Sequence, residues 1–306
     1  MKVLVTGGAG FIGSHLVREL ISTGDEVTVL DNLTTGALNH LPKSGFSFWK
    51  DDIRNKNIRS KVASEHFDTI VHLAAQTMVD SSILNPFFDM EENIAGLVNI
   101  LEAARYGHVH RIVFSSTAAV YGDVKEIYFP ICETADLKPM SFYGLSKATA
   151  EKYLDMYQHL YGLDYVILRF ANVYGERQGD RGEGGVISIF ARQINNNASI
   201  KLFGNGNQTR DFIYAGDIAK GIYQAIITNH TNDIYNLSTG KEISLNELLD
   251  YFNRIVDRPI NVEYEKEREG DIQRSVLSNK KAKKYLKWNP TTNLLDGLRK
   301  TISWRR

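Results

Sequence analysis

A glycine-rich turn close to the start of the chain limits the possible folds more than any other feature of the sequence. The segment Gly7–Gly13, GGAGFIG, directly follows the apolar run Val3–Thr6 and opens a stretch, Phe11–Thr23, whose apolar spacing predicts a helix. A second apolar run, Val27–Leu30, comes next and is followed at once by Asp31. Strand, glycine turn, helix and strand in this order predict a βαβ unit with parallel strands.

The same unit is suited to bind a dinucleotide. Gly7, Gly10 and Gly13 let the backbone approach a pyrophosphate, and the N-terminus of the following helix presents free N–H groups to it. Asp31 stands where a carboxylate accepts hydrogen bonds from the adenosine ribose, and its charge repels a 2′-phosphate. We therefore expect NAD rather than NADP as the cofactor. The alternative is a glycine turn that only packs a helix on a strand.

Short apolar runs continue to alternate with helical patterns through the first half of the chain. The further strand candidates are Phe46–Trp49, Ile70–Leu73, Ile112–Ser115 and Tyr165–Phe170. One long helix is predicted over about residues 85–106, with Asn85 as its cap and Pro86 in its first turn. A second runs over about 142–161 and ends at Gly162. This alternation predicts an α/β fold with a Rossmann-type, doubly wound parallel sheet.

The pattern loosens after residue 172, where glycine- and asparagine-rich stretches occupy 175–185 and 204–207. We expect a cofactor-binding domain over residues 1–172 and a smaller, mixed α/β substrate domain over 173–306. The second domain is expected to be partly discontinuous, with later segments returning to the first.

The composition argues against several classes of partner. The 36 lysines and arginines balance the 36 aspartates and glutamates, so no overall charge attracts nucleic acid or an acidic membrane. No apolar stretch approaches the roughly 20 residues that span a bilayer. The single cysteine, Cys132, cannot form an internal disulfide and lies in no metal-ligand spacing. We expect a soluble, cytoplasmic protein without a metal site.

Two groups of residues further along the chain predict acid–base chemistry. Tyr143 and Lys147 are four residues apart on the second long helix, so the ammonium can favour the phenolate and make Tyr143 a general base. Ser115, Ser116 and Thr117 lie at the end of the fifth strand, where ligands bind in open α/β sheets. His72, at the end of the fourth strand, is more typical of a buried histidine than of a catalyst.

Together these residues resemble the extended short-chain dehydrogenase/reductase family, in its sugar-nucleotide epimerase and dehydratase branch. The resemblance covers nearly the whole chain and is carried by the strings TGGAGFIGSHL, LDNL, SSTAAVYG, YGLSK, LRFANVYG and FGNGNQTRDFIY. It implies that Tyr143 is the catalytic base and that Lys147 supports it and binds the nicotinamide ribose. It also implies that the Thr117 hydroxyl shares the reacting oxygen of the substrate.

The resemblance implies the binding residues as well. Those expected at the cofactor, besides Tyr143 and Lys147, are Gly7, Gly10, Phe11, Ile12, Gly13, Asp31, Asn32, Asp52, Ile53, Leu73, Ala74, Ala75, Gln76, Ser115 and Phe170. Asp52 could accept from the adenine amino group or equally cap a helix, and Gln76 stands where some epimerases carry a lysine. Those expected at the substrate, besides Thr117 and Tyr143, are Ser116, Asn172, Val186, Phe203, Arg210, Arg268 and Asp271. Arg210 and Arg268 would hold the diphosphate, because guanidinium groups bind phosphate in a bidentate way.

The residues after Thr117 help to choose the reaction. Relatives that dehydrate the sugar resemble one another in having Asp-Glu there, and the decarboxylating branch usually has a Glu, whereas this chain has Ala118 and Ala119. Oxidation and re-reduction at one carbon remain, which is 4-epimerisation. The resemblance points to a UDP-hexose as substrate, with UDP-glucose and UDP-galactose interconverted. A UDP-glucuronate substrate, held by Arg177 or Arg181, and a UDP-N-acetylhexosamine stay open.

Two further functions are alternatives to epimerisation. A non-catalytic NAD-binding sensor could have the same fold, but such proteins tend to lose the tyrosine or the lysine. Asp31 argues against a reductase that uses free NADPH. The resemblance also suggests a homodimer, formed through the helices at about 85–106 and 142–161. The apolar stripe that includes Ile94 and Leu101 could equally belong to the core of one subunit.

Overall fold

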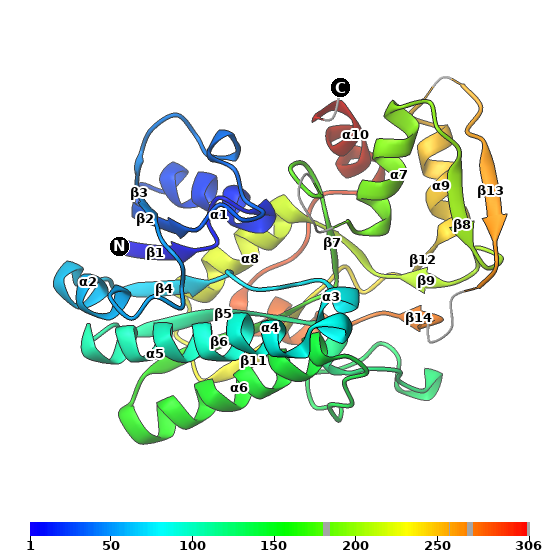
Figure 1. The fold of residues 1–306 in the computed structure, drawn as a ribbon. Helices are drawn as coiled ribbons and strands as arrows, with labels where there is room; N and C mark the ends of the chain where they lie inside the picture. Colours follow the sequence, from blue (N-terminus) through cyan, green and yellow to red (C-terminus); the bar gives the residue numbers. More distant parts are fainter. Residues whose placement is uncertain (180–183, 257, 268–271, 305–306) are drawn as a thin grey trace.

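The computed structural model, which describes residues 1–179, 184–256, 258–267 and 272–304, is built around a parallel sheet covered by helices on both faces (Figure 1). The strands of this sheet are β1 (Lys2–Thr6), β2 (Glu26–Asp31), β3 (Phe46–Lys50), β4 (Thr69–His72), β5 (Arg111–Thr117), β6 (Asp164–Phe170) and β11 (Asp233–Leu237). Their order across the sheet is β11-β6-β5-β4-β1-β2-β3, and each neighbouring pair is parallel. The predicted Rossmann-type sheet is confirmed, with the strand order reversing between β1 and β4.

The two faces of the sheet carry different helices because successive side chains of a strand point to opposite sides. Val3 and Val5 of β1 pack with α1 (Phe11–Ser22) and α8 (Ala215–Ile227) in one core cluster. Leu4, between them, packs with α2 (Ile58–Glu65), α5 (Gly96–Tyr106) and α6 (Phe142–Tyr161) in another. All three β1 residues are fully buried, so an uninterrupted apolar run is what a strand covered on both faces requires.

The first long helix is interrupted. It begins with α4 (Pro86–Met90), continues through a π-helical turn, η2 (Glu91–Ala95), and ends as α5. Asn85 caps it as predicted, since its side chain accepts from the Phe88 N–H at 3.1 Å. Leu97 and Leu101 are fully buried, whereas Phe87 is 64 % exposed. The part of the apolar stripe on α5 therefore belongs to the core of the subunit, whereas the apolar side chain of Phe87 on α4 is exposed.

The second long helix, α6, has the predicted bounds. The Ser141 side chain caps it by accepting from the Gly144 N–H at 3.1 Å, and Gly162 ends it in the left-handed conformation with φ of 70°. Its first turn reaches the carboxyl end of β5, which places Tyr143 and Lys147 at the edge of the sheet where ligands bind.

The chain after residue 172 contributes to two parts of the fold. Strand β11 and helix α8 join the large sheet, while a third core cluster forms around α7 (Val186–Asn195), α9 (Leu245–Asn253) and α10 (Leu294–Trp304). Small sheets accompany the latter: β7 (Asn172–Tyr174) with β10 (Phe212–Tyr214), β8 (Ile200–Phe203) with β13 (Val262–Glu265), and β9 (Thr209–Arg210) with β12 (Ile243–Ser244) and β14 (Arg274–Ser275). The predicted boundary at residue 172 itself stays a prediction.

The remaining described elements are short. They are α3 (Val79–Leu84) and the helical turns η1 (Leu38–His40), η3 (Ala118–Val120), η4 (Glu126–Tyr128) and η5 (Ala282–Leu286). Within the residues that the structure describes, no helix has the length and apolar character needed to cross a membrane.

Candidate active site

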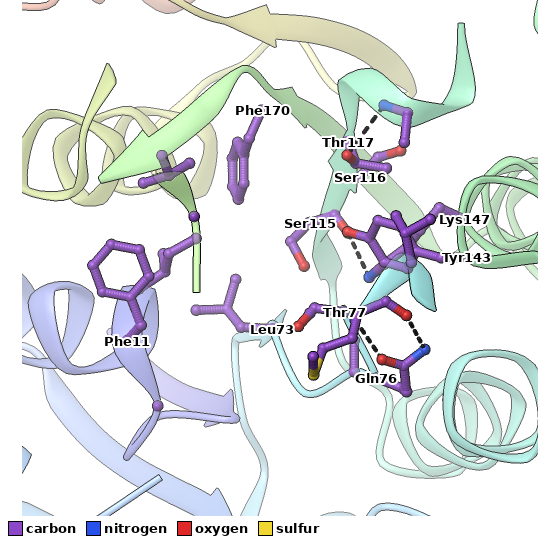
Figure 2. Close-up of a pocket in the computed structure, with 18 of the residues that line it drawn as sticks. Phe11, Leu73, Gln76, Thr77, Ser115, Ser116, Thr117, Tyr143, Lys147 and Phe170 are labelled. Atoms are coloured by element: carbon purple, nitrogen blue, oxygen red, sulfur yellow. Dashed lines mark hydrogen bonds between the residues drawn. The ribbon is translucent and has the colours of Figure 1, made fainter. Parts of the chain in front are cut away.

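A cavity of about 930 Å³ runs along the carboxyl ends of the sheet strands, between the large sheet and the part of the chain around α7 and β9. The predicted cofactor and catalytic residues that border it are Gly7, Gly10, Phe11, Ile12, Gly13, Asp31, Asn32, Ile53, Leu73, Ala74, Ala75, Gln76, Ser115, Ser116, Thr117, Tyr143, Lys147 and Phe170. Figure 2 shows that Phe11 and Tyr143 lie on opposite sides of this cavity. The structure thus brings the predicted nucleotide end and the predicted reacting end into one site.

The glycine turn is packed too closely for side chains. Gly7 has a φ of +70°, and a Cβ there would lie 2.7 Å from the Ala74 nitrogen at the end of β4. A Cβ on Gly13 would lie 2.2 Å from the Gly7 carbonyl oxygen. Gly10, the residue before α1, gives that helix no side-chain cap, so its first N–H groups are open to an anionic ligand.

Asp31 ends β2 at the wall of the cavity and is 7 % exposed. Its carboxylate accepts from the Ala9 N–H at 2.9 Å and from the Leu33 N–H at 2.8 Å, which fixes its orientation. Burial raises the pKa of Asp31 above the ordinary value, and the two N–H groups act in the opposite direction by favouring the charged form. A carboxylate held in this way beside the glycine turn fits the expected contact with the cofactor ribose.

The side chain of Asp52, a predicted cofactor residue, hydrogen-bonds to other residues of the protein. The Asp52 carboxylate pairs with Arg54 at 2.8 Å and accepts from the Asn32 amide at 3.0 Å, and Asp51 rather than Asp52 borders the cavity. The contact of Asp52 with the adenine stays a prediction. Arg54 holds the pKa of Asp52 well below its ordinary value.

The Gln76 side chain is also turned into the protein. Its amide donates to the Asp89 carboxylate at 2.8 Å and to the Met78 carbonyl at 3.0 Å. Gln76 borders the cavity, but its polar atoms stabilise the segment after β4 instead of presenting a free amide to a pyrophosphate.

The reacting groups lie together at the other end of the cavity. The Lys147 ammonium is almost fully buried, donates to the Ser115 carbonyl at 2.9 Å and lies 4.8 Å from the centre of the Phe114 ring. Tyr143 projects from the same helix one turn earlier, and the Thr117 hydroxyl accepts from the Ala119 N–H at 3.2 Å (Figure 2). A buried ammonium next to a phenol and a hydroxyl is an arrangement that can take a proton from an alcohol.

Ser116 differs from its two neighbours. Although it borders the cavity, its hydroxyl donates to the Glu151 carboxylate at 2.6 Å, so it does not offer its proton to a ligand. Ser116 thus lies at the cavity as expected, and its contact with the substrate stays a prediction. His72 is fully buried beneath the site, where burial lowers its pKa to about 3 and keeps it neutral.

The expected substrate residues are partly brought together. Asn172, Val186 and Arg210 border the cavity, and the Arg210 guanidinium also donates to the Thr209 carbonyl at 2.8 Å. Phe203 is not among the described residues that border the cavity, and its expected place at the substrate stays a prediction. Arg268 and Asp271 lie outside the described residues.

Several cavity residues were missed by the sequence reasoning. Thr77 lies in the loop after β4, five residues beyond its end at His72, and the rule that ligands bind after strand ends could have found it. Ile272 and Ser275 come from a segment far along the chain and reach the cavity only through the pairing of β14 with β9. No local pattern marks them.

Residues 3–238 match the family model described as the NAD dependent epimerase/dehydratase family. The chain belongs to this family. It is 45% identical over 306 residues, 99% of this chain and 98% of the relative, to a putative UDP-glucose 4-epimerase of Methanocaldococcus jannaschii. The crystal structure of the Thermotoga maritima UDP-glucose 4-epimerase with UDP-glucose superposes with a TM-score of 0.95 at 36% identity, covering 100% of this chain and 99% of that one. The structure of the UDP-N-acetylglucosamine 4-epimerase of Methanobrevibacter ruminantium superposes with a TM-score of 0.94 at 33% identity, covering 99% of this chain and 97% of that one.

The cofactor of this family, NAD, fits the residues on one side of the cavity. The glycine turn leaves a cradle that any Cβ would fill, and the uncapped N-terminus of α1 lies beside it. Asp31 is held at the end of the neighbouring strand, where a ribose diol would meet it. Leu73, Ala74 and Ala75 supply the apolar and small side chains over which the cofactor would pass toward Lys147.

Proposed function

We propose that this chain is an NAD-dependent 4-epimerase that interconverts UDP-glucose and UDP-galactose. The observation that carries the proposal is the convergence of Tyr143, Lys147 and Thr117 on the cavity end opposite the glycine turn. Ala118 and Ala119, which also border this end, lack the carboxylates that elimination of water requires. Of the chemistries open to the family, reversible oxidation at one carbon suits these residues best.

In this mechanism Tyr143 acts as a phenolate and removes the proton of the sugar 4-hydroxyl. Lys147, one helical turn away, stabilises the phenolate by its charge, and the Thr117 hydroxyl shares the reacting oxygen. NAD, held between the glycine turn and Lys147, would supply the hydride acceptor and donor for C4. The 4-keto sugar turns within the cavity before Tyr143 gives the proton back, so the configuration at C4 is inverted.

Arg210 and Asn172 are proposed to hold the substrate diphosphate at the far side of the cavity. Replacing Arg210 with alanine should raise the KM for the UDP-sugar by about tenfold to a hundredfold, the effect of losing a hydrogen bond to a charged group, while kcat changes little. Initial rates at varied substrate concentration measure both. Lys201→Ala, at an exposed position of β8 in the same part of the chain, is the control and should keep the wild-type KM. An unchanged KM for the Arg210 variant would remove this residue from the substrate site.

The alternatives for the sugar differ in what must bind its substituents. Arg177, considered for a uronate carboxylate, donates to the Ser14 hydroxyl of α1 at 2.8 Å and does not border the cavity, and Arg181 lies outside the described residues. This favours an uncharged hexose. Separate incubations with UDP-galactose, UDP-glucuronate and UDP-N-acetylglucosamine, read by chromatography, test the choice. We expect the 4-epimer of UDP-galactose to form. If only another UDP-sugar gives a product, that sugar would replace UDP-galactose as the proposed substrate. If none of them gives a product, an NAD-binding sensor would be favoured.

We also propose that the enzyme is a homodimer and that it works in the cytoplasm, as its single cysteine suggests. Large apolar side chains of α3, α4 and α6 are exposed: Leu84 is 86 % exposed, Phe87 64 %, Met156 52 % and Leu160 58 %. Exposed apolar side chains on neighbouring helices are typical of an interface between subunits. Light scattering should give twice the 34.6 kDa chain mass, and Met156→Lys with Leu160→Lys should give the single mass. A monomeric wild type would contradict the dimer.

A further inference from the structure

A buried ion pair lies directly behind the reacting groups. The Glu151 carboxylate of α6 and the Arg169 guanidinium of β6 make two hydrogen bonds, of 2.9 and 2.6 Å, and each side chain is 3 % exposed. The Ser116 hydroxyl donates to the same Glu151 oxygen that accepts from Arg169 Nε. Strand β5 is therefore joined to α6 and β6 through one carboxylate.

Arg169 Nη1 and the Tyr121 hydroxyl, which belong to the same cluster, also have hydrogen-bond partners. Arg169 Nη1 donates to the Tyr121 hydroxyl at 2.9 Å and to the Glu133 carbonyl at 3.2 Å, and the Tyr121 hydroxyl donates to Asn236 at 2.8 Å. Desolvation of two charges offsets much of their attraction, so apolar residues of similar volume would often be as stable at such a place. Stability alone thus gives little reason for this ion pair. Its geometry can instead fix the positions of α6 and β5 relative to each other.

The residues of this cluster lie next to the reacting groups on both α6 and β5. Tyr143, Lys147 and Glu151 follow at intervals of four on α6, so all three lie on the same side of the helix. On β5, the Ser115 carbonyl accepts from Lys147 and the Ser116 hydroxyl donates to Glu151, so two consecutive residues are tied to α6 immediately before Thr117. In the sheet, Ser116 is the direct register partner of Arg169, so both side chains reach the Glu151 carboxylate from the same face.

We propose that Glu151, acting through Ser116, is a positioning residue that sets the distance between Thr117 and the Tyr143–Lys147 pair. The inference rests on the proposed epimerase function, because it concerns how the reacting groups of that function are aligned. Without the Ser116 bond, the end of β5 would be joined to α6 at this point through the Ser115 carbonyl alone. The distance between the Thr117 hydroxyl and the Lys147 ammonium would then be less well fixed.

Ser116→Ala is the direct test, because it removes the hydroxyl and leaves the Glu151–Arg169 pair intact. We expect kcat to fall by about tenfold to a hundredfold, as misplacement by about 1 Å can cause. The KM, the affinity for UDP-glucose by calorimetry and the NAD content should stay near those of the wild type. Ser116→Thr, which keeps a hydroxyl, should restore most of kcat. Ser238→Ala, which removes another buried hydroxyl that donates to the Leu277 carbonyl, is the matched control and should keep the wild-type kcat.

A second variant separates positioning from stability. Glu151→Gln would leave the buried Arg169 charge uncompensated and could fail to fold, so the pair is replaced together as Glu151→Leu with Arg169→Met. This double variant should fold and bind NAD, yet show the low kcat of Ser116→Ala, and adding Ser116→Ala to it should lower kcat no further.

The outcomes separate this inference from the proposed function. An active wild type, with either Ser116→Ala or the folded double variant at the wild-type kcat, would overturn the positioning role and leave the function standing. A wild type that epimerises no UDP-sugar would overturn the function and the inference with it.

Discussion

Replacing Tyr143 with phenylalanine is expected to lower kcat by about 10²- to 10⁴-fold, the contribution of a general base to proton transfer. The ring would still fill its place at the start of α6, but the variant would have no group to take the proton of the sugar 4-hydroxyl. Because Asp31 and the glycine turn lie at the other end of the cavity, the amount of NAD bound should not change. Epimerisation of UDP-galactose and the cofactor released on denaturation measure the two quantities.

Tyr153→Phe is the matched control for this experiment. Tyr153 lies on the same helix but is 38 % exposed and does not border the cavity, so its variant should keep the wild-type kcat. A Tyr143→Phe enzyme with nearly wild-type kcat would show that another residue is the base. Loss of NAD from it would show that the phenol holds the cofactor instead of reacting.

Gly13→Ala is expected to remove the bound cofactor. The added Cβ would lie 2.2 Å from the Gly7 carbonyl oxygen and 2.6 Å from the Gly8 Cα, both in the backbone, so the turn must open. Each hydrogen bond to the pyrophosphate lost in this way would weaken NAD binding by about tenfold to a hundredfold. Calorimetry with NAD, together with circular dichroism to establish that the chain is folded, measures the effect.

The control is Gly24→Ala, at the end of the same helix. Gly24 also has a positive φ, of +81°, but a Cβ there would meet nothing within 4 Å. It should lose a little stability from backbone strain and keep its affinity for NAD. A Gly13→Ala protein that binds NAD as the wild type does would contradict the assignment of the turn as the pyrophosphate site.

The sequence could predict those features that depend on residues near one another along the chain. The strands β1 to β6, the glycine turn and the bounds of α6 follow from apolar periods, caps and turn glycines, which act over a few residues. The position of Tyr143 and Lys147 followed because both lie on one helix whose start Ser141 fixes.

The features that the sequence could not predict depend on distant partners. Nothing near Ser116 shows that its hydroxyl meets Glu151, 35 residues away, and nothing near Asn32 shows that its amide meets Asp52, 20 residues away. The π-helical turn η2 inside the first long helix is likewise not marked by any local pattern.

The central claim is that C4 of the sugar is oxidised and reduced again by the same bound cofactor. The most direct measurement uses UDP-galactose that carries deuterium at C4, incubated in ordinary water with unlabelled NAD in solution, and reads the UDP-glucose formed by mass spectrometry and NMR. We predict that the product keeps its deuterium at C4. Loss of the deuterium to water or to the free NAD, or the absence of UDP-glucose, would contradict the mechanism.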